Sequence, residues 1–117
     1  MRTSPKKSSP RHPSETRAAW WYRLRGYRLL DRNVWCAGAE LDLVARRGRI
    51  VAFVEVKSKS GVGFGDPLEM VTPLKVERLR RAARAWLASR PDLRGLTIRF
   101  DVAAERAGRL EVVQDAF

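Results

Sequence analysis

The sequence contains only one cysteine and one histidine, and this scarcity excludes several classes of site. The single thiol, Cys36, allows no internal disulfide, so a reducing compartment is the default expectation. One cysteine and one histidine cannot build a Cys/His zinc site. No apolar run is long enough to span a bilayer, and the chain start lacks the charged segment and apolar block of a signal peptide. The sequence therefore predicts a cytoplasmic protein with no membrane partner.

Acidic residues are also few, since 13 acids stand against 24 lysines and arginines, and the formal net charge is +11. Four of these charges lie in residues 1–13, a segment of Ser, Pro, Lys and Arg without acids. We expect this segment to be a disordered basic arm, because it cannot bury enough surface to offset the entropy of ordering. The arm either attracts phosphate non-specifically or is an untidy terminus. The remaining positive charge indicates a polyanionic partner, most often nucleic acid, although a basic composition can also serve solubility alone.

The remaining residues, 14–117, are enough for one domain with one core. Ser14 suits the N-cap of a helix over 14–25, and Thr72 with Pro73 opens a second helix that ends near Ser89. Strand-like segments occupy 27–35, 39–46, 49–58, 96–104 and 109–114. The expected order is α-β-β-β-α-β with an extra C-terminal strand. This order predicts an α/β protein whose mixed central sheet is flanked by helices.

Two charged residues, Glu55 and Lys57, interrupt the otherwise apolar strand at 49–58. Alternate residues of a strand share a face, so both charges lie opposite a face that is wholly apolar. Burying a charge costs several kcal/mol unless it is paired or bound. The preceding strand alternates in the same way. Its apolar face carries Leu41, Leu43 and Ala45, and its other face carries Glu40, Asp42 and Val44. The apolar faces of the two strands should lie together against one core.

The turn between these strands is expected at residues 48–49, which suits a type II′ hairpin. It places Asp42 opposite Glu55 and Glu40 opposite Lys57, and a turn one residue earlier shifts the pairing by two but keeps the same faces. Opposed Cβ atoms lie about 4.5–5.5 Å apart, so two carboxylates repel unless a cation lies between them. Carboxylate oxygens suit Mg²⁺ or Mn²⁺. The pattern predicts either such a metal site or a buried salt-bridge cluster.

Asp42 followed by Glu55-Val56-Lys57 resembles the D…(D/E)-x-K signature of the PD-(D/E)XK nuclease superfamily, whose core has the same α-β-β-β-α-β order. More narrowly, the chain resembles the YraN-like family of uncharacterised predicted nucleases, which are related in fold to archaeal Holliday junction resolvases. The resemblance covers residues 14 to about 103 and implies a restriction endonuclease-like core. The matching segments are SETRAAWWYRLRGYRLLDRN, GAELDLVARRG, VAFVEVKSKS, GFGDPLEMVTPLK and RFDV.

The resemblance implies a role for each residue of the signature. Asp42 and Glu55 would coordinate Mg²⁺ or Mn²⁺, with the backbone carbonyl of Val56 as a further ligand. Lys57 would position or activate the attacking water. The catalytic role of these residues therefore rests on the likeness, whereas their common face follows from the strand pattern.

Two further acids, Glu15 and Glu40, match acidic positions of the family near its site. Where the family usually has Gly before the second of these acids, this chain has Ala39. Glu15 shares a helical face with Ala18, Ala19 and Tyr22. From the residues alone, Glu15 either points inward to the site or contacts solvent at the helix start.

Basic residues flank the expected site. Arginines fill the arc of the second helix opposite its apolar stripe, and this arc either contacts phosphate or is a solvated face. Lys75 resembles a basic residue of the family and either reaches a scissile phosphate or lies on the surface. The glycine-rich loop at 61–65 suggests a flexible flap over the site. The residues predicted to bind nucleic acid are Lys59, Lys75, Arg78, Arg81 and Arg84.

The remaining conspicuous residues favour structural roles. Asp101 is expected to form an ion pair with Arg99, two residues away on the same face, rather than to take part in catalysis. The tryptophans are expected in the core or at an interface rather than as stacking platforms for bases, namely Trp20, Trp21 and Trp86. Trp35, beside the turn at 36–38, is left without an assignment.

These features together predict a metal-dependent endonuclease that hydrolyses DNA phosphodiester bonds, with branched structures among its expected substrates. A water held by Mg²⁺ and Lys57 would attack the phosphate in line. One alternative is a nucleic-acid-binding module of nuclease fold without turnover, and another is an interaction protein whose acids form a buried ion network. Resolvase-like enzymes cut two strands symmetrically, so the resemblance also suggests a homodimer.

Overall fold

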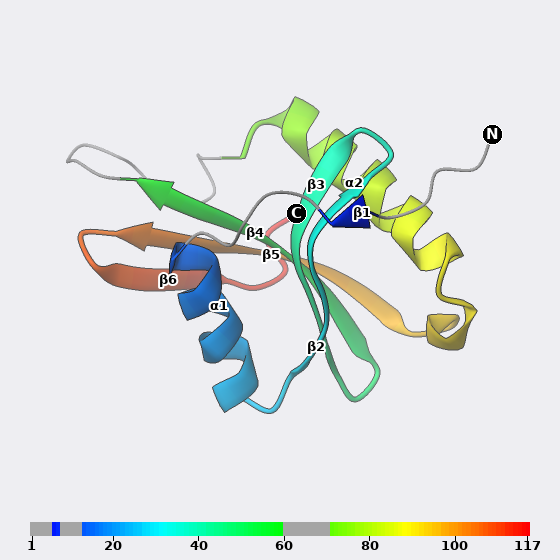
Figure 1. Ribbon diagram of the computed structural model, residues 1–117, viewed down its shortest axis with the longest axis horizontal. Coiled ribbons are helices and arrows are strands. Elements are labelled where there is room, and N and C mark those ends of the chain that lie inside the picture. The colour runs from blue at the N-terminus through cyan, green and yellow to red at the C-terminus, as the bar shows by residue number, and fades with distance from the viewer. Residues whose placement is uncertain (1–5, 8–12, 60–70) are drawn as a thin grey trace.

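A mixed β-sheet with one helix on each face forms the body of the protein (Figure 1). The computed structural model describes residues 6–7, 13–59 and 71–117, without the side chains of residues 6, 7 and 59. The elements in these residues are β1 (Lys6–Lys7), α1 (Pro13–Leu24), β2 (Arg28–Cys36), β3 (Ala39–Arg47), β4 (Ile50–Lys59), α2 (Pro73–Ala88), the 3₁₀ turn η2 (Pro91–Leu93), β5 (Thr97–Arg106) and β6 (Arg109–Val113).

The six described strands lie in the sheet in their chain order, from β1 to β6. Only β4 and β5 pair in parallel, and α2 lies between them in the chain. Parallel neighbours need such a long crossover, whereas short turns join β2 to β3, β3 to β4 and β5 to β6, which pair antiparallel. The predicted α/β class, the α-β-β-β-α-β order and the extra C-terminal strand are confirmed, and the predicted element ends lie within two residues of the observed ones.

Residues 1–13, predicted to be a disordered arm, include two that the structure places in the sheet. Lys6 pairs with Trp35 and Lys7 with Val34 at the edge of the sheet, and Pro13 begins α1. Strand pairing at an open edge uses backbone groups, so it does not need the apolar side chains on which the sequence prediction rested. The other residues of the arm lie outside the described part of the chain.

The sheet is buried on both faces, so the prediction of one core against one apolar face is wrong. Leu43, Ala45, Ala52 and Val54 pack against α1, in a cluster with Ala18, Ala19 and Tyr22. Val44, Val51 and Phe53 pack against α2, in a second cluster with Leu79, Ala83 and Trp86. A strand covered by a helix on each side needs apolar residues at successive positions, which explains the nearly continuous apolar run of β4.

The hairpin from β3 to β4 has the predicted turn at residues 48–49. Arg47 pairs with Ile50, and Gly48 has a φ of 59°, as the first position of a type II′ turn requires. The ladder continues to Leu43 opposite Val54 and is recorded no further. The predicted register is therefore confirmed up to Leu43 and Val54, the neighbours of Asp42 and Glu55 in the chain.

Side-chain alternation along β3 changes at Asp42. Leu43 packs in the cluster of α1, but Leu41 packs in the cluster of α2, although regular alternation would put both on one face. The predicted common face is therefore wrong for Leu41. Beyond Leu43 the ladder with β4 no longer constrains the strand, so β3 can turn at Asp42.

In the described part of the chain, neither helix has both the length and the apolar character needed to cross a bilayer.

Candidate metal centre

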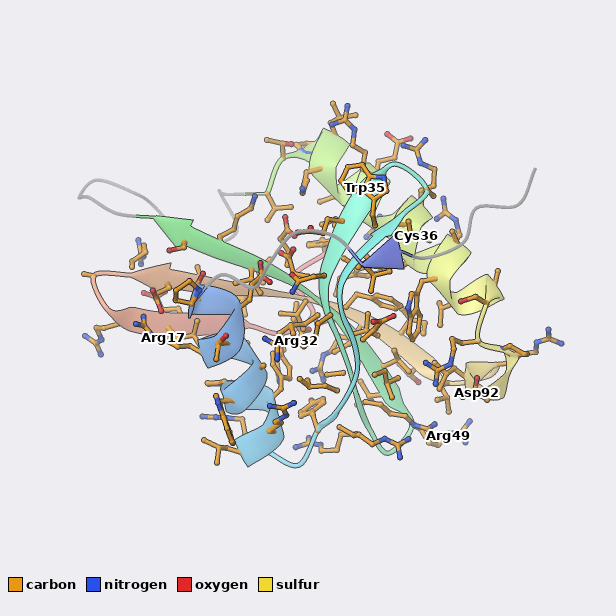
Figure 2. The ribbon with its side chains drawn as sticks, viewed as in Figure 1. Arg17, Arg32, Trp35, Cys36, Arg49 and Asp92 are labelled. Carbon is orange, nitrogen blue, oxygen red and sulfur yellow. The ribbon has the colours of Figure 1, made fainter. Side chains whose placement is uncertain are left out.

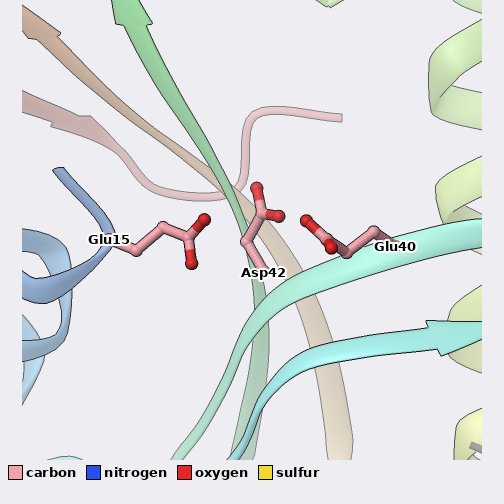
Figure 3. Close-up of side chains that lie close together, drawn as sticks. All are labelled: Glu15, Glu40 and Asp42. Carbon is pink, nitrogen blue, oxygen red and sulfur yellow. The ribbon is translucent and has the colours of Figure 1, made fainter. Parts of the chain in front are cut away.

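Three carboxylates converge where the ladder between β3 and β4 ends (Figure 3). Glu15 comes from the first turn of α1, and Glu40 and Asp42 come from β3. One carboxylate oxygen from each lies within 4.8 Å of the other two. Glu15 therefore points inward. Ala18 and Ala19 on the same helical face are fully buried, which lets α1 approach the sheet closely.

Asp42 is the most confined acid of this group, with 8% of its surface exposed. Its Oδ2 accepts a hydrogen bond from the backbone N–H of Val56 over 2.8 Å. Burial raises the pKa of Asp42 to about 9, with the charge of Glu55 and hydrogen bonds with Glu55 and Glu40 acting in the same direction and the Val56 N–H opposing them. Without a cation, Asp42 therefore holds a proton at neutral pH.

Glu55 is held between two lysines on the other side of Asp42. It is 4% exposed, and its Oε2 lies 3.4 Å from Nζ of Lys57 and 3.4 Å from Nζ of Lys75. Lys75 reaches this point from the start of α2, where Thr72 Oγ1 accepts a hydrogen bond from the Lys75 N–H. The cap of α2 therefore helps to place a second cation at the site.

The site joins the two faces of the sheet. Glu15 arrives from α1 on one face, and Lys75 arrives from α2 on the other. Apolar side chains of Phe53, Leu79 and Phe100 line the space next to Asp42 and Glu55. Charges in such a poorly hydrated place interact more strongly than charges in water. The arrangement can hold a divalent cation on one side and an anionic group at the lysines on the other.

Residues 14–104 match the family described as uncharacterised protein family UPF0102. The chain belongs to this family. It is 44% identical over 105 residues to a UPF0102 protein from Geobacter sulfurreducens, a match that covers 86% of this chain and 80% of that protein. It is 46% identical over 98 residues to one from Beutenbergia cavernae, with 81% and 82% covered. One from Acidothermus cellulolyticus is 44% identical over 117 residues, with 88% and 89% covered.

The predicted site residues of this UPF0102 protein fall into two groups. Asp42 lies with Glu15 and Glu40, whereas Glu55 lies beside them with Lys57 and Lys75. Val56, predicted as a ligand through its carbonyl, contacts Asp42 through its N–H. The segment that matches the family contains both groups and the strands β3 and β4.

The predicted basic face is present in part. Arg78, Arg81 and Arg84 are exposed on α2. The side chain of Lys59 and the loop at 61–65 lie outside the described residues. These arginines therefore form a positively charged helix surface on the element that also supplies Lys75.

The ion pair predicted for Asp101 is confirmed, with Nε of Arg99 2.8 Å from its Oδ1. Sequence reasoning missed its other partners, because they come from distant segments. Oδ2 accepts a hydrogen bond from the hydroxyl of Tyr22 over 2.6 Å, and Oδ1 accepts one from the N–H of Asp115 over 3.0 Å. Asp101 is fully buried and ties α1, β5 and the C-terminal segment together.

The tryptophans occupy different environments. Trp86 is buried in the apolar cluster between α2 and the sheet, and its indole N–H donates a hydrogen bond to Asp31 over 2.9 Å. Trp20 is 54% exposed on α1, and Trp35 is 51% exposed on β2. Trp35 lies opposite Glu40 in the ladder between β2 and β3, a position that the sequence analysis did not connect with the site. The short turn after Cys36 could have predicted this pairing, because the turn sets the register of β2 against β3.

Proposed function

We propose that this UPF0102 protein is a metal-dependent endonuclease of the PD-(D/E)XK type that hydrolyses DNA phosphodiester bonds. The observation that supports this most strongly is the convergence of Glu15, Glu40 and Asp42 next to the strand that bears Glu55 and Lys57. Neither a core nor an exposed surface needs several carboxylates crowded into one poorly hydrated place. A reaction that requires a divalent cation does.

The donor set fits Mg²⁺ or Mn²⁺, because it consists of carboxylate oxygens. Asp42, Glu15 and Glu40 would hold the ion, with Glu55 adjacent to it. The high pKa of Asp42 supports this fit, since a cation would take the place of the proton that the metal-free cluster retains. When bound, the ion supplies charge neutralisation and a water of lowered pKa.

The lysines supply the positive charge of the protein itself. Lys57 and Lys75 both contact one oxygen of Glu55 and are both partly exposed, so each can exchange this contact for a phosphate oxygen or a water. Lys57 would orient the attacking water, and Lys75 would contact the phosphate that is cut. The ammonium groups stabilise the charge that develops on the phosphate.

The basic surface supports a nucleic-acid partner in the cytoplasm. Arg78, Arg81 and Arg84 are exposed on the helix that begins at Lys75, and the chain carries a net charge of +11. Arginines on a helix next to a phosphate-cutting site would hold the flanking phosphates and set the orientation of the strand. Cutting two strands symmetrically would require a homodimer.

A cleavage screen tests the proposal. Wild type, Asp42→Asn, Glu55→Gln and Lys57→Ala are incubated with linear duplex, single-stranded, flap and four-way-junction DNA and with RNA, in Mg²⁺, in Mn²⁺ and in EDTA. Wild type should cut DNA only with a divalent cation, and each variant should lose the activity while it keeps a cooperative unfolding transition. Glu77→Gln, which removes an exposed acid from α2, is the matched control and should cut like wild type. Persistent cutting by all three site variants would refute the proposal.

The second candidate is a nucleic-acid-binding module of the same fold without turnover. The exposed Arg78, Arg81 and Arg84 of α2 support it equally, because contacts of arginines with phosphate do not require cleavage. Salt-sensitive binding without cleavage of any substrate in the screen would identify this module. Calorimetric titration with Mn²⁺ separates both candidates from a purely structural network, which would bind no ion or bind it equally in Asp42→Asn.

A further inference from the structure

Trp35 is a half-exposed aromatic residue beside the acidic group. Figure 2 shows its side chain on β2, near the turn into β3. Trp35 lies directly opposite Glu40 of β3, and 51% of its surface is exposed. Opposed residues of an antiparallel ladder have Cβ atoms about 4.5–5.5 Å apart. The side chain of Trp35 therefore begins next to that of Glu40, one of the three acids of the candidate metal centre.

The burial of its neighbours shows which face of the sheet Trp35 occupies. Val34 and Cys36 are both fully buried in the cluster of α2. Because successive side chains of a strand point to opposite faces, Trp35 lies on the face of α1, from which Glu15 reaches the site. Trp35 is thus on the same side of the sheet as two of the three acids, Glu15 and Glu40.

The exposure of Trp35 is not explained by the fold. A tryptophan that serves the core is buried and bonded, as Trp86 is through its indole N–H. Aromatic side chains beside a few polar groups are common in binding sites. The strongly basic chain favours an occupant that is anionic overall, and the exposed indole favours one that offers a flat apolar face. A nucleotide has both properties, through its phosphate and its base.

We propose that Trp35 is a stacking platform for an unpaired nucleobase of the strand that is cut at the metal centre. This inference rests on the nucleic-acid function proposed above and names its substrate class, namely strands with unpaired bases at the cut. A base inside a continuous duplex has both faces covered by its neighbours, so it cannot stack on a protein side chain. Single strands, flaps and junction arms present free base faces.

The test compares two ligands of equal charge, an oligothymidylate and a base-free chain of the same number of sugar-phosphate units. Their affinities are measured by fluorescence anisotropy in Ca²⁺ instead of Mg²⁺, and the intactness of the ligands is checked afterwards by electrophoresis. Stacking is worth about 1–3 kcal/mol per base, so wild type should prefer the oligothymidylate by roughly 5- to 150-fold. Trp35→Ala should bind the two ligands equally, with its affinity for the base-free chain unchanged.

Two variants serve as controls. Trp35→Phe retains an aromatic face and should keep most of the preference. Trp20→Ala removes a tryptophan of similar exposure from the surface of α1 and should keep all of it. An undiminished preference for bases in Trp35→Ala would overturn the inference.

Cleavage in Mg²⁺ separates the inference from the function on which it rests. If wild type cuts DNA and Trp35→Ala cuts flap and duplex DNA in the same ratio as wild type, the inference fails and the nuclease proposal stands. If wild type shows a Trp35-dependent preference for bases but no cleavage, the nuclease proposal fails and the stacking contact stands. If wild type binds neither ligand, both are overturned. Repeating the comparison with oligouridylate distinguishes RNA from DNA as the source of the base.

Discussion

The backbone N–H of Val56 donates a hydrogen bond to Oδ2 of Asp42 over 2.8 Å, so a side chain joins β3 to β4 where their ladder ends. This contact keeps the strands together while β3 turns, which is visible in the packing of Leu41 and Leu43 on opposite faces. Asp42 thereby becomes reachable both from α1, which brings Glu15, and from the side of Glu55. The end of the ladder thus creates the acidic site.

Asp42→Asn should stabilise the metal-free protein at neutral pH. The pKa of Asp42 is about 9 in the folded chain and near its ordinary 3.8 in the unfolded chain, so the folded chain retains a proton that the unfolded chain releases. Stability is therefore lost progressively as the pH rises from about 4 to 9. An asparagine removes this loss and can still accept the Val56 N–H.

Urea unfolding in EDTA at several pH values checks this prediction. Each pKa unit corresponds to about 1.4 kcal/mol, and relaxation of the site reduces the total, so we expect a gain of roughly 1–3 kcal/mol at pH 7. The gain should shrink as the pH falls below the ordinary pKa of 3.8, where aspartate is protonated in both states. Glu77→Gln, at an exposed position on α2, should show no such trend. A variant that is less stable than wild type at pH 8 would contradict the assignment.

Mn²⁺ or Mg²⁺ should raise the melting temperature of wild type but not that of Asp42→Asn. A ligand that binds only the folded state adds RT ln(1 + [L]/Kd), about 2.7 kcal/mol at a hundredfold excess over Kd. Glu15→Gln should weaken binding in calorimetric titrations, because Glu15 is the carboxylate that α1 contributes. Equal Mn²⁺ affinity in wild type and Glu15→Gln would remove α1 from the metal centre.

Much of the fold could be predicted because it depends on local patterns. Gly48 at the first position of a two-residue turn determined the register of β3 and β4, and Thr72 caps α2 as predicted. The predicted N-cap of α1 is wrong, because this helix begins at Pro13 and Ser14 lies inside it. The second core was not predicted, although Val51 and Phe53 offered apolar side chains on the face assigned to the charges. The prediction gave one face of the hairpin to the core and the other to the charges, whereas a sheet between two helices buries apolar side chains on both faces.

The sequence brought some of the candidate residues together but did not give their arrangement. Strand alternation placed Asp42 near Glu55, and the charge of Glu55 indeed acts on the pKa of Asp42. The inward direction of Glu15 and the contact between Lys75 and Glu55 depend on how α1 and α2 dock on the sheet. The position of Trp35 opposite Glu40 follows from the short turn after Cys36, whereas the irregularity of β2 between Leu29 and Asp31 has no such local signal. Neither docking nor such irregularities are local properties of a sequence.

Replacing both lysines that contact Glu55 should lower the stability by more than the sum of the two single replacements. Lys57→Met and Lys75→Met each leave the carboxylate with one cation, so we expect losses of about 1 kcal/mol or less. The double variant leaves a nearly buried carboxylate unpaired, a change that typically costs about 3–5 kcal/mol. Chemical denaturation of all four proteins at pH 7 measures this coupling.

Glu55→Gln is the control for that cycle. In the double lysine variant it removes the unpaired charge and should restore most of the lost stability. Additive losses in the cycle, or no recovery with Glu55→Gln, would mean that the two lysines do not share this carboxylate.

Tyr22→Phe should lower stability without affecting the metal centre. The Tyr22 hydroxyl donates to the fully buried Asp101 over 2.6 Å, and burial raises the pKa of Tyr22 far above its usual range, so the donor is retained at any ordinary pH. Loss of a hydrogen bond to a charged group costs about 1.5–3 kcal/mol. Tyr27→Phe removes a contact with Arg99 instead and should cost less. Mn²⁺ titrations should be unchanged in both variants, and a large loss of metal affinity in Tyr22→Phe would show that Asp101 supports the site.

Replacing Arg78, Arg81 and Arg84 of α2 together by alanine should weaken DNA binding in a way that depends on salt. Each phosphate contact contributes about 0.9 to the slope of log K against log salt, so loss of three contacts should reduce the slope by about 2–3. The weakening should be similar for unrelated DNA sequences, because contacts to phosphate do not read bases. Arg94→Ala, an exposed arginine beyond η2, is the control and should leave the slope within one contact of wild type. A triple variant with an unchanged slope would show that this face of α2 is a solvated surface, and the search for the DNA path would move to the other basic residues around the metal centre.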